Sequence, residues 1–100
     1  MKKGVYSVLQ DYNKECYVTG AVTGLELHHI YFGSKNKNAS DDNGFVVWLT
    51  YEKHRGTYGV HGKYGHELDQ QLKEECQAAY EALGHTREEF MRLIGKSYIP

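Results

Sequence analysis

The run Phe-Val-Val-Trp-Leu-Thr at residues 45–50 does most to constrain the fold of this chain. It is rich in β-branched and aromatic side chains and follows a polar stretch, which is the pattern of a buried β-strand. The run is far shorter than the ~18 apolar residues of a membrane span. Because the chain has 100 residues, we expect a single domain, residues 1–100, with a small core.

A second strand is predicted over residues 25–30, where apolar and polar side chains alternate. His28 and His29 are neighbours in this strand and should therefore point to opposite faces. Between the two strands, the polar residues 33–44 have glycine at each end and predict a surface loop. A further short strand is expected over residues 4–10.

The last third of the chain predicts two helices. Apolar residues recur at helical spacing from His66 to Leu83, and Gly84 provides a stop. A second helix, residues 86–95, begins with Thr86 and Glu89 at the spacing of a capping box. Four glycines make residues 56–65 irregular. The fold class expected is therefore α+β.

Charge is distributed unevenly although the net charge is only −1. Residues 28–63 hold five basic and three acidic side chains, whereas residues 64–100 hold four basic and seven acidic ones. Chance combined with an acidic helix face explains this asymmetry as well as a phosphate-binding region does. We expect a cytoplasmic protein without a membrane partner, since no signal peptide is evident. Cys16 and Cys76 are then expected to be free thiols.

Four of the six histidines lie in the basic middle third: His28, His29, His54 and His61. Three imidazoles can hold one divalent cation and leave positions open for a phosphate oxygen and water. The fourth can accept a proton near neutral pH. Together these groups suffice for metal-assisted hydrolysis of a phosphodiester. For any one histidine alone, an unremarkable polar residue on a loop or strand is the better interpretation.

The order Leu-Glu-Leu-His-His-Ile, polar loop, Phe-Val-Val-Trp-Leu-Thr-Tyr-Glu-Lys-His-Arg-Gly and Gly-Val-His resembles HNH endonucleases. The resemblance is closest to small phage and prophage proteins related to recombination-enhancement nucleases, and it covers about residues 16–98. It implies a ββα-metal (HNH/treble-clef-like) core over about residues 16–84, followed by a C-terminal helical pair. It also implies a metal-dependent nuclease that hydrolyses DNA.

The same resemblance suggests roles for individual residues. His29 matches the general base, and His28, His54 and His61 match ligands of one divalent ion, which could be Mg²⁺, Mn²⁺, Ni²⁺ or Zn²⁺. An asparagine, Asn43 or alternatively Asn36, would orient the base. In such a reaction four cationic side chains would contact DNA phosphates, although each one taken singly is better explained as a solvated loop charge: Lys35, Lys37, Arg55 and Lys63.

Relatives of this kind often carry Cys-x-x-Cys before the histidine pair and Cys-x-x-Cys or Cys-x-x-His after the second strand, and these residues together hold a structural zinc. Here the corresponding positions read Cys16-Tyr-Val-Thr19 and Thr50-Tyr-Glu-Lys53. Because a tetrahedral site needs four ligands, no structural zinc is expected. Packing around Trp48, Tyr17 and Val18 is expected to hold this turn instead.

Two other functions are compatible with the sequence. A catalytically inactive HNH-like module could bind nucleic acid or a host defence protein. A closed regulatory or structural metal site would use His29 as a further ligand and leave no base. As the near-neutral charge predicts weak DNA binding, a homodimer or a host or phage protein could supply additional affinity.

Four tyrosines flank the histidines in the sequence: Tyr31, Tyr51, Tyr58 and Tyr64. They could contact sugars or bases, although such tyrosines more often pack partly buried.

Overall fold

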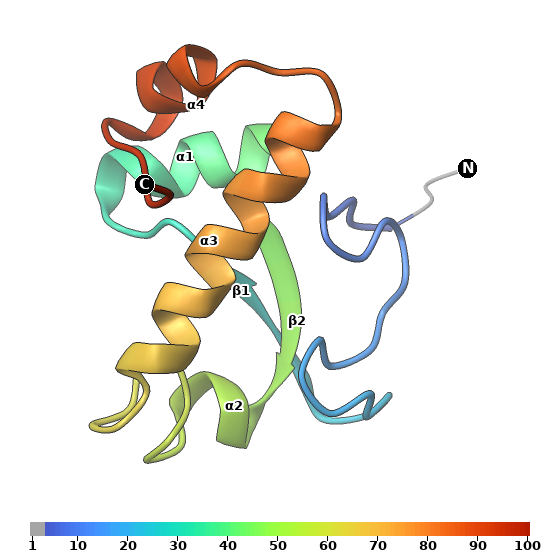
Figure 1. Ribbon diagram of the computed structural model, residues 1–100. Helices are drawn as coiled ribbons and strands as arrows, with labels where there is room; N and C mark the ends of the chain where they lie inside the picture. Colours follow the sequence, from blue (N-terminus) through green and yellow to red (C-terminus); the bar gives the residue numbers. More distant parts are fainter. Residues whose placement is uncertain (1–3) are drawn as a thin grey trace.

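The computed structural model describes residues 4–100, apart from the side chain of Ser34. It is an α+β fold in which a two-stranded antiparallel sheet is combined with helices (Figure 1). The elements, in chain order, are β1 (Leu25–His29), α1 (Ser34–Asn43), β2 (Val46–Thr50), α2 (Tyr51–Arg55), α3 (His66–Ala82) and α4 (Arg87–Ile94).

Both predicted strands are present and pair with each other. Leu25 lies opposite Thr50, Leu27 opposite Trp48, and His29 opposite Val46. In β2 all residues except Trp48 and Thr50 are buried, as expected for its β-branched and apolar side chains. α3 runs alongside the pair of strands (Figure 1).

The core is formed where the sheet meets α3 and α4. Phe45, directly before β2, makes edge-on ring contacts with Tyr31 and Tyr80 at centroid distances of 5.5 and 5.2 Å. Phe90 of α4 packs against the same rings. Since each fully buried aromatic side chain contributes roughly 1.5–3 kcal/mol, this cluster fixes α3 and α4 against the strands. Of the two interpretations open for Tyr31, contact with nucleic acid or packing, the structure shows packing: Tyr31 is a core residue that is only 1% exposed.

The prediction of a loop at residues 33–44 was wrong, because Ser34–Asn43 form helix α1. The segment lacks an apolar stripe, so no helical pattern is visible in its sequence. Tertiary contacts stabilise it instead: the buried Ser40 donates its hydroxyl to the Tyr31 carbonyl at 2.8 Å. Gly44 ends the helix with a left-handed φ of 74° and donates its amide to Ser40.

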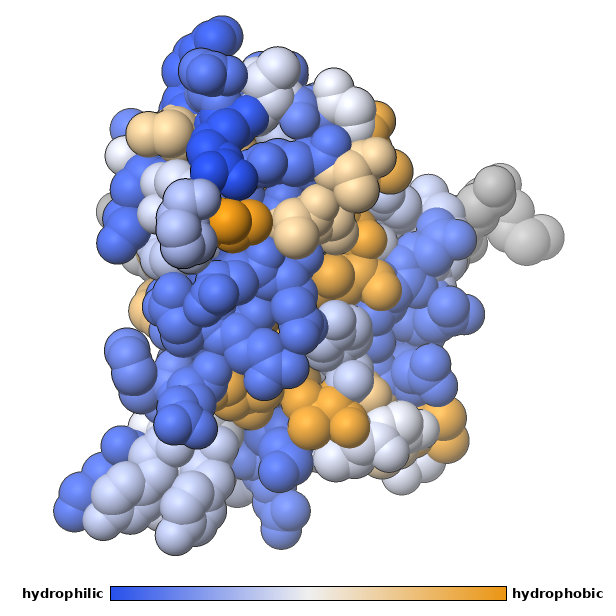
Figure 2. Space-filling model, in the orientation of Figure 1, coloured by the Kyte–Doolittle hydropathy of each residue, from blue (hydrophilic) through white to orange (hydrophobic). Residues whose placement is uncertain are grey.

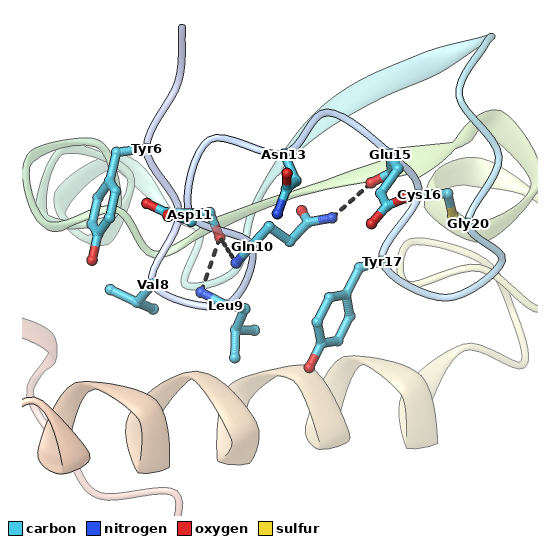
Figure 3. A pocket seen from close by; sticks show the side chains of 11 residues that line it. Tyr6, Val8, Leu9, Gln10, Asp11, Asn13, Glu15, Cys16, Tyr17 and Gly20 are labelled. Atoms are coloured by element: carbon cyan, nitrogen blue, oxygen red, sulfur yellow. Dashed lines mark hydrogen bonds between the residues drawn. The ribbon is translucent and has the colours of Figure 1, made fainter. Parts of the chain in front are cut away.

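The predicted strand at residues 4–10 is also not formed. A single bridge joins Ser7 and Asp11. The Ser7 hydroxyl accepts hydrogen bonds from the amides of Leu9 and Gln10, a local turn that competes with an extended strand. Residues 6–20 line a cavity of about 580 Å³, in which the Gln10 side chain reaches the Glu15 carbonyl (Figure 3).

Both helices of the last third were predicted correctly. α3 places Leu72, Cys76 and Tyr80 in the core, and α4 begins with the predicted capping box of Thr86 and Glu89. Hydrophilic residues cover the outer face of α3, whereas hydrophobic residues gather beside it, toward the N-terminal segment (Figure 2). No helix within residues 4–100 combines the length and the apolar character needed to cross a membrane. Cys16 and Cys76 are both buried, free thiols, as expected.

Candidate metal centre

Three histidines from separate segments of the chain meet at one place. His28 lies on β1, His54 on α2, and His61 in the glycine-rich segment 56–65. Their ring centroids are 4.9–5.1 Å apart. One ligand nitrogen from each ring lies within 4.8 Å of the other two. The three side chains expected to bind the metal therefore share a site that could hold one ion.

His54 is oriented by the carboxylate of Glu26, two residues before His28 on the same strand. The Glu26 Oε1 atom lies 2.7 Å from His54 Nδ1 and 3.1 Å from Arg55 Nε. A carboxylate only accepts hydrogen bonds, so Nδ1 carries the proton and Nε2 keeps the lone pair that a metal requires. The hydrogen bond from His54 holds the pKa of Glu26 below its usual value, with a smaller contribution from Arg55.

His28 is the most deeply buried of the three ligands and is 1% exposed. Burial, followed by the neighbouring His54 and His61, lowers the pKa of the His28 imidazole to about 3. Burial and then His54 also lower the pKa of His61. The rings of His28 and His61 are therefore neutral near pH 7, the form in which imidazole binds metals.

The His28 Nε2 atom is buried and has no hydrogen-bond partner. Such an orphaned polar atom is rare in a folded protein and calls for a partner. Imidazole nitrogens bound to one tetrahedral ion at ~2.1 Å lie roughly 3.4 Å apart, so modest ring movements would bring all three together. The donor set and the orphaned nitrogen both fit a divalent metal.

His61 is positioned by backbone hydrogen bonds between segment 56–65 and α2. The His61 amide donates to the His54 carbonyl at 3.0 Å, and the Val60 amide donates to the Lys53 carbonyl at 2.9 Å. At Gly62 a Cβ atom would overlap with the carbonyl oxygen of Gly56. The glycines thus permit a close backbone approach that fixes His61 against α2.

His29 lies beside the three clustered histidines and lines the same cavity, which measures about 290 Å³. Its Nε2 atom is 2.6 Å from Asp41 Oδ1 of α1. By the same reasoning as for His54, Nε2 carries the proton and Nδ1 is left as an acceptor. The Nδ1 atom of His29 is therefore the one available for proton transfer.

The residue that orients His29 is Asp41, whereas the sequence had suggested Asn43 or Asn36. The Asn43 side chain donates instead to the Ala39 carbonyl one turn earlier in α1, at 2.9 Å. Asn36 also lies on α1. Neither Asp41 nor Glu26 was identified from the sequence. Glu26 shares a strand face with His28 and could have been found, but Asp41 depends on a helix that was predicted as a loop.

Two of the four proposed phosphate-binding side chains reach the cavity. Lys37 of α1 and Arg55 of α2 line it together with the histidines. Lys35 is exposed on α1, and the Lys63 ammonium lies 5.3 Å from the centroid of the Tyr64 ring. Phe32 completes one wall, with its ring centroid 5.2 Å from that of His61.

The turn around Cys16 is held by hydrogen bonds. The thiol accepts the Thr50 amide at 3.4 Å, and the Tyr17 amide donates to the Trp48 carbonyl at 2.9 Å. Burial raises the pKa of Cys16, but hydrogen bonds from Thr19, Thr50 and Val18 outweigh it and lower the pKa to about 7. The Val18 side chain is 43% exposed and does not pack as expected.

Comparison with protein-family models, with curated proteins and with solved structures gives no match. The function is therefore inferred from the geometry of the chain's own residues.

Proposed function

We propose that the protein is an HNH-type, metal-dependent endonuclease that hydrolyses DNA phosphodiester bonds. One observation carries the proposal: three histidine nitrogens lie within 4.8 Å of one another, and His29 lines the same cavity without being one of them. A closed structural site would have to draw His29 in as a ligand. Its 2.6 Å contact with Asp41 instead holds the ring on the α1 side.

The arrangement of the segments supports a ββα-metal core. The ligands come from the first strand, from the helix after the second strand and from the segment that leads into α3. This is the order implied by the resemblance of the sequence to HNH nucleases. The additional helix α1 between the strands supplies Asp41 and Lys37 to the site.

In the proposed reaction His29 removes a proton from the water that attacks the phosphorus in line. Asp41 keeps the proton on His29 Nε2, so that Nδ1 accepts the new one. His28, His54 and His61 would hold the ion, which would supply stabilisation of negative charge on the scissile phosphate and the leaving oxygen. Lys37 and Arg55 neutralise neighbouring phosphates. The products carry 5′-phosphate and 3′-hydroxyl ends.

Nicking of supercoiled plasmid tests the proposal. The purified protein is incubated with plasmid and Mg²⁺, Mn²⁺, Ni²⁺ or Zn²⁺, and His29→Ala is compared with the wild type. We expect nicking by the wild type, a loss of about 100-fold or more in His29→Ala, and metal binding by calorimetry that is retained in the variant.

The alternatives give different results. Absence of cleavage with every metal would leave a nucleic-acid or protein-binding module. Loss of metal affinity in His29→Ala would identify His29 as a fourth ligand and the site as a closed one. Supercoiled plasmid is a suitable substrate because it contains both duplex and transiently unpaired regions, so the test does not presuppose the form of DNA cleaved.

A further inference from the structure

Two neighbouring tyrosine side chains of segment 56–65 are exposed to solvent. Tyr58 is 69% exposed and Tyr64 is 56% exposed. Their rings stack with a centroid separation of 5.4 Å and an interplanar angle of 28°. Neither ring belongs to the hydrophobic core. An exposed aromatic pair on one short segment is the kind of surface that marks a binding site.

The pair is presented by a preformed segment. The Tyr64 amide donates to the Thr57 carbonyl at 2.8 Å, and the Gly59 amide donates to the Gly56 carbonyl at 2.9 Å. A Cβ atom at Gly65 would overlap with the Gly59 carbonyl, as one at Gly62 would with Gly56. The segment is therefore closely packed, and a ligand that stacks on the tyrosines need not order it first.

The same segment carries His61, which connects the tyrosines to the candidate metal centre. Three residues of extended chain span at most about 11 Å, so the Tyr64 backbone lies within that distance of His61. Lys63 lies between them in sequence, and its ammonium is 5.3 Å from the Tyr64 ring centroid. The loop thus carries the tyrosine rings, the Lys63 ammonium and the His61 imidazole close together. Proteins that bind single-stranded nucleic acid combine aromatic rings, which stack on bases, with cations, which contact the phosphates.

We propose that Tyr58 and Tyr64 form a stacking platform for unpaired bases next to the scissile phosphate, so that the site prefers single-stranded DNA. The proposal rests on the nuclease function and specifies its substrate. In a duplex, both faces of each base are covered by its neighbours, and only an unpaired base offers a face to a tyrosine ring. Stacking tolerates every base, so no sequence preference is expected from this surface.

A second exposed tyrosine pair provides a matched comparison. Tyr6 and Tyr12 have ring centroids 5.6 Å apart and are 40% and 45% exposed. They lie in the N-terminal segment, well away from segment 56–65 (Figure 1). The same segment carries two acidic residues, Asp11 and Glu15. Tyr12→Ala therefore removes an exposed aromatic ring without touching the proposed platform.

Fluorescence anisotropy with a labelled oligothymidylate and a duplex of equal length tests the platform. The measurement is made in EDTA so that no strand is cleaved. We expect the wild type to bind the single strand more tightly than the duplex. Loss of one base–aromatic stack corresponds to about 5- to 150-fold in affinity. Tyr58→Ala and Tyr64→Ala should each weaken single-strand binding by this factor and leave duplex binding nearly unchanged.

The remaining variants give the controls. Tyr58→Trp should retain tight binding because it preserves an aromatic face, and Tyr12→Ala should match the wild type. Equal affinity of Tyr58→Ala, Tyr64→Ala and wild type for the single strand would overturn the platform, even if plasmid nicking depends on His29. The reverse result, tyrosine-dependent binding without nicking by any metal, would support the platform and refute the nuclease.

Discussion

At the scale of single residues, Glu26 links two parts of the candidate site. One of its oxygens receives hydrogen bonds from both His54 and Arg55, at 2.7 and 3.1 Å. It therefore fixes the ring of His54, a candidate metal ligand, and also the guanidinium of Arg55 at the cavity. Carboxylates that orient metal-binding imidazoles in this way typically contribute 10- to 100-fold to metal affinity.

We predict that Glu26→Ala weakens metal binding by about 10- to 100-fold, because His54 loses the acceptor that fixes its tautomer. Calorimetric titration of Zn²⁺ or Ni²⁺ into the metal-free protein measures the change. Glu74→Ala, which removes an exposed carboxylate from α3, is the matched control and should bind like the wild type. An unchanged affinity in Glu26→Ala would show that His54 is oriented by something else.

At the scale of elements, sequence patterns predicted what hydrophobic burial and capping determine. The strands at residues 25–29 and 46–50 follow from their alternating or continuous apolar side chains, and α4 follows from its capping box. Helix α1 could not be predicted, since its polar sequence has no apolar stripe and its contacts with β1 and α4 are not visible in the sequence. The four histidines were identified because residue type alone suggests their chemistry. Asp41 could not be identified from the sequence, because its contact with His29 depends on the position of helix α1.

The glycine-rich segment 56–65 is the element whose backbone the site depends on most. We predict that Gly62→Ala displaces His61, because the added methyl group overlaps with the Gly56 carbonyl. Overpacking of this kind costs about 1–3 kcal/mol, and the metal affinity should fall together with the thermal midpoint. Thr57→Ala in the same segment keeps the backbone unchanged and should preserve both values. A Gly62→Ala protein that binds metal as tightly as the wild type would contradict this account of the loop.

At the scale of the whole molecule, a bound ion would connect β1, α2 and segment 56–65, which otherwise meet through a few hydrogen bonds and ring contacts. Binding at a metal concentration 100-fold above Kd stabilises a folded protein by about 2.7 kcal/mol. For a domain of this size each kcal/mol raises Tm by roughly 4–8 °C.

We therefore predict that Zn²⁺, Ni²⁺ or Mn²⁺, whichever binds tightest, raises Tm by roughly 10–20 °C. Differential scanning fluorimetry measures the shift, and EDTA should reverse it. His29→Ala should show the full shift because His29 is not one of the three clustered histidines, while His61→Ala should lose most of it. The same shift in His61→Ala as in the wild type would mean that the ion binds elsewhere, and the three histidines would then have no common role.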